Sequence, residues 1–461
     1  MTDFAALLQP DRGQPARRIE IVAPGDFAGW LVRQPARTRT AIAAHGLTGK
    51  AGNRAILPGD GAEDWSALLV CDEPMASPWR FASLGGFLPA GTYRLDGDAG
   101  AGALGWLLGQ YRFDRYRTPG ESGGRVLLTA DAARIDETVR LAQATALVRD
   151  LVNTPASDCG PAELEACAEA LAKRHGATLT VIRGDPLQTG FPMIHTVGHA
   201  AVRDRHPRLI ELEWGDPAHP RIALVGKGVS FDTGGLDIKP SAGMRLMKKD
   251  MGGAAHVLAL AGLVMAAKLP VRLHLLVPAV ENAIGSAAFR PGDVLRTRAG
   301  LTVENTNTDA EGRLILGDAL TKAVEGKPEL ILDYATLTGA ARVALGPDLP
   351  PLFANDDALA DALLAAGTAV GDPLWRMPLW DGYDELLKSD IADLQNAPEG
   401  GFAGAVTAAL FLRRFVPKEI AWAHLDVFAW RPAAKPGRPK GGDAFGVRAA
   451  WAVLKDRYAP R

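Results

Sequence analysis

The 461-residue chain has little cysteine and almost no net charge. Its three cysteines, Cys71, Cys159 and Cys167, are too few and too irregularly spaced for a disulfide framework or a four-cysteine zinc site. A net charge of -2 gives no electrostatic reason to expect nucleic acid as a partner, because nucleic-acid-binding proteins normally carry a clustered basic surface. The composition therefore favours a protein of a reducing, cytoplasmic compartment.

Long hydrophobic runs are also missing. The most apolar stretch, Ala254 to Ala267, contains His256 and stops at Lys268, and it is shorter than the roughly 20 residues that a membrane-spanning helix needs. The first residues, MTDFAALLQPDRGQPARR, scatter acids and polar residues instead of placing a basic segment before an apolar one, as a secretory leader does. We therefore expect a soluble cytoplasmic protein with no membrane contact.

The length of the chain exceeds what one hydrophobic core usually fills, so two domains are expected. Apolar runs separated by Gly- and Pro-rich turns predict a small N-terminal α/β domain over residues 1–135. Apolar residues at helical spacing then predict a connecting helix over 136–155, which Pro155 terminates. Residues 156–461 form the second domain.

Apolar runs and helical patterns alternate regularly in the second domain. The strand candidates are 178–182, 209–214, 222–225, 271–277, 329–334 and 420–425, and the helix candidates are 161–175, 252–267, 314–324, 358–366, 404–415 and 446–455. This alternation predicts an α/β domain with a mixed, largely parallel central sheet flanked by helices on both faces. Ligands of such sheets bind where the strands end in loops.

Three segments of the second domain gather ionisable residues beside glycines or in turns. They are GKGVSFDTGGLDIKP at 226–240, MKKDMGGAA at 247–255 and NTDAEGRL at 307–314, and we expect all three to lie on loops after or between strands. Charged side chains among so much apolar sequence cost free energy unless something neutralises them. Two divalent cations are the most economical candidate.

Other interpretations of these segments have to be weighed. The Gly-rich turn around Lys227 suits phosphate binding, but neither the P-loop spacing nor G-x-G-x-x-G is met. In an extended turn, Asp309 and Glu311 point the same way, at one metal pair, yet at a helix N-terminus the same acids complement the dipole. Asp250 taken alone is more often a helix cap than a ligand. The nine histidines form no ligand-spaced motif.

The residue types nevertheless suit a metal centre. Carboxylates such as Asp232, Asp250, Asp309 and Glu311 are oxygen ligands for Mg²⁺, Mn²⁺ or a carboxylate-rich zinc site. A lysine ligates a metal only as the neutral amine, whereas a charged lysine polarises a carbonyl and stabilises the oxyanion formed from it. Lys227 and Lys239 can therefore play opposite roles. Arg313 keeps its proton, so it can only hold an anion.

The stretch VGKGVSFDTGGLDIKPSAGMRLMKKDMGGAAHV, followed by NTDAEGRLILGDAL and ATLTGA, resembles the cytosolic leucyl aminopeptidase family, the M17 di-metal peptidases. NTDAEGRL is the signature octapeptide of that family and is unbroken here. The resemblance runs from about Leu151 to near the C-terminus. It implies a leucyl-type metallo-exopeptidase with two Mn²⁺ or Zn²⁺ ions and a bicarbonate per subunit, which acts on peptides with a free N-terminus and assembles as a homohexamer.

The resemblance also implies a role for individual residues. One metal would be held by Lys227, Asp232, Asp250 and Glu311, and the more exchangeable one by Asp232, Asp309 and Glu311. Lys239 matches the catalytic lysine, which polarises the scissile carbonyl while a water bridging the metals attacks. Arg313 matches the catalytic arginine, which anchors a bicarbonate base with help from the backbone of Leu337. The pocket for the first side chain would include Met247, Thr336 and Gly339.

The sequence departs from the family pattern at a few positions. Thr233 stands where Ser is usual, Lys248-Lys249 stands where Arg-Ala is commoner, and residues 429–448 differ from the better-known members. These departures concern the side-chain pocket more than catalysis. Two other functions remain open: a di-metal hydrolase of another amide or a phosphoester, and a non-catalytic member that binds DNA or regulates.

Overall fold

The computed structural model describes residues 2–61, 63–72, 77–95, 97–118 and 123–460, and they form two compact units. The smaller unit holds residues up to Ala146 together with 369–371 and 433–440, and the larger unit holds the remainder. The division falls inside helix α5 (Ile135–Asn153). The predicted two-domain α/β organisation is confirmed.

The smaller unit is built on a six-stranded sheet. Its strand order is β1 (Leu8–Pro10), β6 (Arg125–Thr129), β5 (Gly91–Leu95), β2 (Arg17–Val22), β4 (Trp65–Val70) and β3 (Arg54–Pro58). All neighbours pair in parallel except β3 and β4. The helices of this unit are α1 (Phe27–Val32), α2 (Ala36–Ala44), α3 (Trp79–Ala82) and α4 (Gly102–Leu108). Tyr93 and Trp106 pack edge to face in its core.

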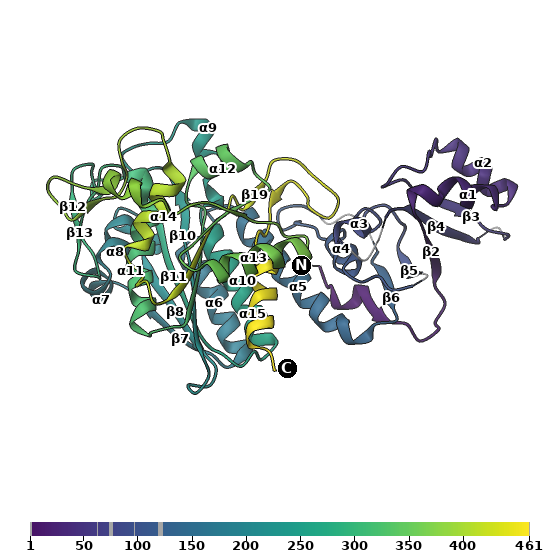
Figure 1. Ribbon diagram of the computed structural model, residues 1–461, viewed down its shortest axis with the longest axis horizontal. Helices are drawn as coiled ribbons and strands as arrows, with labels where there is room; N and C mark the ends of the chain where they lie inside the picture. The colour runs from purple at the N-terminus through teal and green to yellow at the C-terminus, as the bar shows by residue number, and fades with distance from the viewer. Residues whose placement is uncertain (1, 62, 73–76, 96, 119–122, 461) are drawn as a thin grey trace. The chain divides into compact units, whose positions relative to one another are not determined.

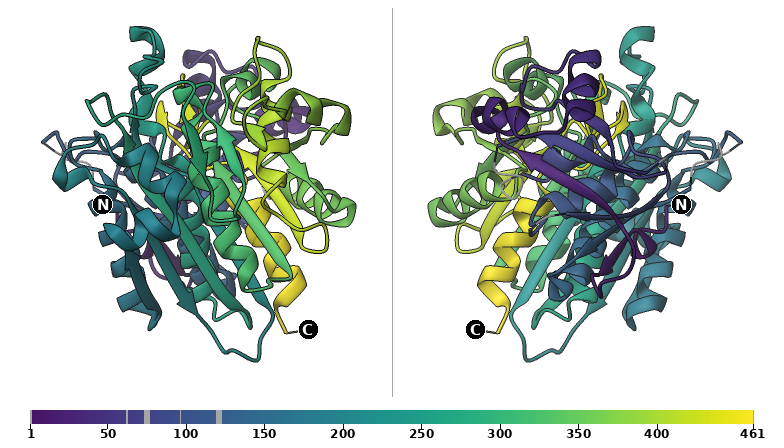
Figure 2. Two further views of the ribbon diagram at one scale, coloured as in Figure 1. Left: turned by 90° about the vertical axis from the view of Figure 1, so that its left-hand side faces the viewer. Right: turned by 90° about the vertical axis from the view of Figure 1, so that its right-hand side faces the viewer.

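The larger unit is built on a nine-stranded mixed sheet. Its order is β16 (Trp375–Arg376), β15 (Pro351–Ala354), β18 (Ala421–Asp426), β14 (Leu330–Ala335), β9 (Arg221–Gly226), β11 (Arg272–Asn282), β8 (Arg208–Trp214) and β7 (Thr178–Ile182), and β10 (Gly228–Asp232) pairs with β11. The central strands β18, β14, β9 and β11 are parallel. Strand β15 pairs antiparallel with β18 and parallel with β16, and β8 pairs antiparallel with both β11 and β7. The mixed, largely parallel sheet was therefore predicted correctly. Figure 2 shows the twist of these strands.

Helices cover both faces of this sheet. One face carries α6 (Pro161–His175), α10 (Gly252–Ala266) and α15 (Val447–Tyr458), and the other carries α8 (Pro192–Gly198), α11 (Glu311–Glu325) and α14 (Gly404–Arg413) (Figure 1). Further helices are α7 (Asp185–Gly190), α9 (Ser241–Met244), α12 (Gly339–Leu345) and α13 (Asp357–Ala369). Two small sheets complete the unit: β12 (Val294–Arg296), β13 (Thr302–Glu304) and β17 (Leu394–Gln395), and β19 (Trp430–Arg431) with β20 (Gly441–Gly442).

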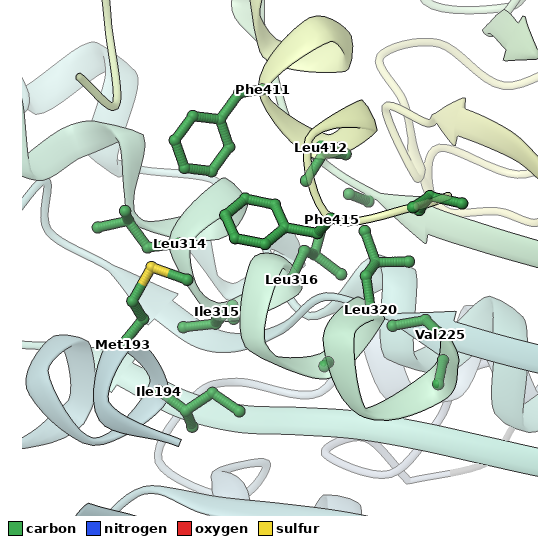
Figure 3. Close-up of a cluster of buried hydrophobic side chains, with 14 of the residues drawn as sticks. Met193, Ile194, Val225, Leu314, Ile315, Leu316, Leu320, Phe411, Leu412 and Phe415 are labelled. Carbon is green, nitrogen blue, oxygen red and sulfur yellow. The ribbon is translucent and has the colours of Figure 1, made fainter. Parts of the chain in front are cut away.

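The contact between α11, α14 and α8 is a dense apolar cluster (Figure 3). Leu316 of α11 and Phe415, just after α14, are buried there. A methyl group on Gly317 would lie 2.8 Å from Met193 Cε and 3.0 Å from a ring carbon of Phe415, so a larger residue there would force these side chains to shift. Each fully buried apolar side chain of this size stabilises the fold by about 1.5–3 kcal/mol. This cluster fixes α11, whose first turn carries charged residues, against the sheet.

Two predicted boundaries were wrong near these charged residues. The strand predicted over 271–277 continues to Asn282, because pairing with β8 and β10 extends it past Pro278. The helix predicted over 314–324 begins at Glu311, where a 3₁₀ turn (Thr308–Ala310) capped by Asn307 leads into it. The charged segments therefore do not all lie on loops, and Asp309 and Glu311 are not in an extended turn. Asp232 ends a strand, and Glu311 and Arg313 begin a helix.

None of the described helices is both long enough and apolar enough to cross a bilayer.

Candidate metal centre

The charged segments meet at one edge of the large sheet. Strands β9 and β14 are parallel, and both are parallel to β11, as is β10, so their carboxyl ends share an edge. Lys227 follows β9, Asp232 ends β10 and Thr336 follows β14. The beginnings of α10 and α11 bring Asp250 and Glu311 to the same place. The edge where strands end is where ligands bind in sheets of this kind.

Two lysines bridge four carboxylates at this edge. Lys227 Nζ lies 2.7 Å from Asp250 Oδ2 and 2.9 Å from Glu311 Oε1. Lys239 Nζ lies 2.8 Å from Asp232 Oδ2 and also pairs with Asp309 Oδ1. The structure thus brings together all the residues that the sequence suggested as metal ligands. It also places Lys239, the suggested catalytic lysine, in contact with two of them.

The two lysines do not satisfy all the oxygens of these carboxylates, and the arrangement of the oxygens suits a bound cation. One oxygen each from Asp232, Asp309 and Glu311 lies within 4.8 Å of the others. Glu311 Oε2 is buried, and no described residue donates a hydrogen bond to it. Burial and the neighbouring Asp232 raise the pKa of Glu311 to about 8 and that of Asp309 to about 6. The remaining negative charge and the all-oxygen donor set suit hard divalent ions.

The Lys227 ammonium is held firmly in its charged form by these pairs. Burial disfavours its charge, but Asp250 and Glu311 outweigh burial and raise the pKa of Lys227 above its ordinary value. In the same way burial opposes ionisation of Asp250, and Lys227 nevertheless lowers the pKa of that carboxyl. Lys227 can act as a neutral metal ligand only if an incoming cation displaces its proton.

Close backbone packing holds Lys227 in place. Its N–H donates to Tyr334 O at 2.9 Å, which joins the segment after β9 to β14. A methyl group on Gly253 would lie 2.1 Å from Tyr334 O and 2.7 Å from the Lys227 nitrogen. Glycine at the start of α10 therefore lets the helix approach the sheet edge closely enough to place Asp250 beside Lys227.

Two neighbours orient the carboxylates. Asn282 Nδ2 donates to Asp232 Oδ1 at 2.9 Å and to Thr308 O at 3.1 Å. The Thr336 hydroxyl lies 2.8 Å from Asp250 Oδ1, to which it donates. Thr336 was expected only in the substrate pocket, and Asn282 was missed. The position of Asn282 depends on the register of β10 with β11, which sets it opposite Asp232. No local sequence motif reveals that register.

Arg313 and Leu337 both lie near Asp426. Arg313 Nη1 donates to Asn396 O at 2.7 Å, its Nε is buried without an acceptor among the described residues, and burial lowers the pKa of its guanidinium to about 10. The Leu337 N–H donates to Asp426 Oδ1 at 2.8 Å. An anion at Arg313 would therefore share this N–H with Asp426. Neither Asn396 nor Asp426 was found by sequence reasoning.

A cavity of about 420 Å³ opens beside the carboxylates. Its lining includes Lys227, Asp232, Lys239, Asp250, Asp309 and Arg313, and also the expected pocket residues Met247, Thr336, Leu337 and Gly339. Glu311 lies behind them, in contact with Lys227. Lys249 also lines the cavity, and burial lowers the pKa of its ammonium to about 8. A cavity of this size accepts a small organic ligand.

Comparison with known families decides the class of this site. A model of the "Cytosol aminopeptidase family, catalytic domain" matches residues 146–451, and one of the "M17 aminopeptidase, N-terminal domain" matches residues 18–129. The chain belongs to the cytosol aminopeptidase family. It is accordingly a metal-dependent aminopeptidase, and the predicted family and enzyme class are confirmed.

Individual members of the cytosol aminopeptidase family are similar over most of the chain. Probable cytosol aminopeptidases of Roseiflexus castenholzii and Geobacter sulfurreducens are 43% and 44% identical over 76% and 77% of this chain, and the matches cover 75% and 74% of those proteins. A crystal structure of cytosol aminopeptidase from Coxiella burnetii superposes with a TM-score of 0.93 at 46% identity, covering 98% of this chain and 99% of that one. The bottromycin maturation enzyme BotP, in complex with Mn, superposes with a TM-score of 0.85 at 32% identity, covering 98% and 99%.

Proposed function

We propose that the chain hydrolyses the N-terminal residue from peptides by means of two divalent cations held at the edge of its large sheet. The observation that carries this proposal is the convergence of the buried Asp232 and Glu311 with the more exposed Asp309, whose oxygens lie within 4.8 Å of one another. Every residue of the centre belongs to the larger unit. This supports assigning catalysis to residues 156–461, with 1–135 as a separate domain and 136–155 as the connector.

The contacts support a division of the ligands between two ions. Lys227, Asp250 and Glu311 already form one group, and Asp232 and Asp309 form another around Lys239. In the assignment we favour, one ion takes Lys227, Asp232, Asp250 and Glu311, and the other takes Asp232, Asp309 and Glu311. Carboxylates accept both Mn²⁺ and Zn²⁺, and a solved structure of the similar BotP is in complex with Mn.

When bound, the metal pair supplies an attacking water of lowered pKa and an anchor for the free amine of the substrate. The side chains of the chain do the rest. Asp232 and Asp309 hold the Lys239 ammonium at the cavity wall, where its charge can polarise the scissile carbonyl and stabilise the oxyanion. Arg313 has a buried Nε that finds no acceptor among the described residues and that a bicarbonate base could accept from, and Leu337 lines the same cavity.

The substrate pocket follows from the same cavity. Met247, Thr336 and Gly339 line it together with the carboxylates, so a first side chain placed there would have its own α-amine at the metal ligands. An enzyme that needs the amine as a ligand cleaves only at a free N-terminus. This requirement distinguishes the proposal from a general di-metal amidase or phosphoesterase.

A homohexamer in the cytoplasm is the assembly we propose. Several large apolar side chains of the larger unit are exposed in the isolated chain, among them Phe402 at 92% and Val343 at 87%. Exposed apolar residues of this kind are often buried between subunits. Light scattering of the purified protein is the direct test, and a stable monomer would contradict the assembly.

The central test compares leucine p-nitroanilide with its N-acetylated form, together with the metal content per chain. We expect two ions per chain, turnover of the free-amine substrate and none of the acetylated one. Equal turnover of both substrates would favour the general amidase. A metal-replete protein with no turnover of either would contradict catalysis at this site.

A further inference from the structure

The cavity wall next to the metal centre carries a buried lysine that lacks a close partner. Lys249 is 5% exposed and lines the cavity. Its Nζ lies 3.9 Å from Asp250 Oδ1, beyond hydrogen-bonding reach, and no described residue accepts a hydrogen bond from it. Asp250 itself is paired with Lys227 at 2.7 Å. A buried ammonium in this position costs free energy unless something in the cavity meets it.

A second cation stands on the same wall. Arg342 of α12 lines the cavity, and no described carboxylate pairs with its guanidinium. Its Cζ lies 4.6 Å from the centre of the Phe428 ring, and Lys249 Nζ lies 5.3 Å from the centre of that same ring. Cation–π contact with one phenyl group keeps both cations at the wall without neutralising either.

The nearby acid offsets only part of this positive charge. Asp426 lines the cavity too, but its oxygens accept hydrogen bonds from the Leu337 and Thr338 N–H groups and from the Thr338 hydroxyl. Its carboxylate is thereby committed to the loop after β14. Because Asp250 is paired with Lys227, this part of the wall holds the two cations Lys249 and Arg342 against the single carboxylate of Asp426, an excess of one positive charge.

The backbone beside Phe428 is strained. The next residue, Ala429, has φ +54°, a left-handed conformation that costs a non-glycine residue about 1–3 kcal/mol. A methyl group on Gly252 would lie only 2.6 Å from Ala429 Cβ, so α10 packs tightly against Ala429. Such strain persists only where the surroundings enforce it, and here it holds the phenyl ring within reach of both Lys249 and Arg342.

We propose that Lys249 and Arg342 form a carboxylate-recognition subsite that makes the enzyme select peptides whose first residue is acidic. The inference rests on the proposed function and specifies its substrate class. A glutamate or aspartate side chain in this cavity would meet two cations, whereas a leucine side chain would leave Lys249 buried without a partner. A free C-terminal carboxylate of a dipeptide is the other source of the same chemistry, and the two can be separated.

The test measures kcat/KM for the p-nitroanilides of glutamate and leucine, which have no C-terminal carboxylate. We expect the glutamate-to-leucine ratio to fall by about 10- to 100-fold in Lys249→Met, the loss typical of one charged hydrogen bond, and to fall in Arg342→Met as well. Lys248→Met is the matched control. Lys248 donates to Asn153 O at 2.5 Å and lies over the Trp430 ring, outside the cavity lining, so its ratio should stay near that of the native protein.

A ratio that is the same in the native protein and in Lys249→Met would overturn the inference. Leu-Gly and its C-terminal amide form the second arm. If Lys249→Met loses discrimination between these two while the anilide ratio is unchanged, the cations bind the C-terminus, and selection of the first residue is wrong. If the native protein shows no metal-dependent cleavage of either anilide, the proposed function fails, and the inference fails with it.

Discussion

Gly312 lies directly against the side chain of Lys227. A methyl group on residue 312 would stand 2.6 Å from both Cε and Nζ of that lysine. The contact lies in the first turn of α11, one residue after Glu311, and the atoms that would have to move are the flexible end of Lys227. A larger residue at 312 would therefore displace Lys227 in the metal centre without disturbing the helix backbone.

Gly312→Ala should separate stability from activity. Alanine is favoured over glycine in a helix by about 1 kcal/mol, so the thermal midpoint of the metal-free protein should hold or rise. The displaced Lys227 should weaken metal binding and lower kcat/KM at least about tenfold. Differential scanning fluorimetry, metal analysis and anilide turnover would check this. A variant with native metal content and turnover would show that Lys227 has room to move.

Gly317→Ala is the control in the same helix. Here the added methyl meets Met193 and Phe415 in the apolar cluster of Figure 3. Overpacking of a core costs about 1–3 kcal/mol, so the midpoint should fall while the metal content of the folded protein stays native.

Thr336→Val should weaken metal binding without unfolding the protein. The change keeps the shape of the side chain and removes the hydroxyl that orients Asp250. Loss of a hydrogen bond behind a ligand typically lowers metal affinity about 10- to 100-fold. Titration of the apo-protein with Mn²⁺ would measure it. Thr321→Val, which removes a hydroxyl bonded to Gly317 O further along α11, should leave the affinity unchanged.

Lys239→Met should lower kcat and spare the metal ions. The change removes the charge held between Asp232 and Asp309, and loss of one oxyanion-stabilising group commonly lowers kcat about 10²- to 10³-fold. Metal content near two ions per chain together with this loss would support a role in carbonyl activation. Loss of metal along with activity would instead indicate that Lys239 organises the ligands.

Asp318→Asn should change how stability depends on pH. Asp318 accepts the Met193 and Arg298 N–H groups, both at 2.8 Å, and burial raises its pKa to about 7. Because the pKa in the unfolded chain is lower, about 3.9, the stability that this carboxyl contributes is complete below about pH 4 and is lost as the pH rises through 7. The difference in thermal midpoint between the native protein and the variant should therefore become smaller as the pH rises from about 4 to above 7. A difference that does not vary with pH would contradict the raised pKa.

Removal of the metal ions should cost stability as well as activity. Ions that bind only the folded state stabilise it by about 2.7 kcal/mol at a free concentration one hundred times Kd. We expect a chelator to abolish turnover and lower the thermal midpoint, and added Mn²⁺ or Zn²⁺ to restore both. An unchanged midpoint would mean that the carboxylates do not hold the ions.

Elements with local end signals were predictable from the sequence. The predicted helix 161–175 and strand 178–182 match α6 and β7, because Pro161 opens the helix and Gly176, at φ +68°, closes it. The end of β11 and the existence of β10 could not be found in this way. Both depend on pairing between segments far apart in the chain.

The same division applies to the metal centre. NTDAEGRL and its companion segments pointed to the charged residues, which the structure brings together, because their chemistry is unusual in apolar sequence. Asn282, Asn396 and Asp426 are polar residues without a motif, and they reach the centre only through sheet register and loop packing. The contacts of these three residues could therefore be assigned only from the folded structure.

The two lysines among the four carboxylates have a consequence for how the enzyme matures. Lys227 and Lys239 neutralise half of the carboxylate charge by direct ion pairs, so the chain can bring its acids together before any ion binds. We therefore expect that synthesis and metal loading can be separate events. A single preparation folded in metal-poor medium could be charged with manganese in one tube and zinc in another, and the metal it carries in a cell would reflect supply at the time of loading.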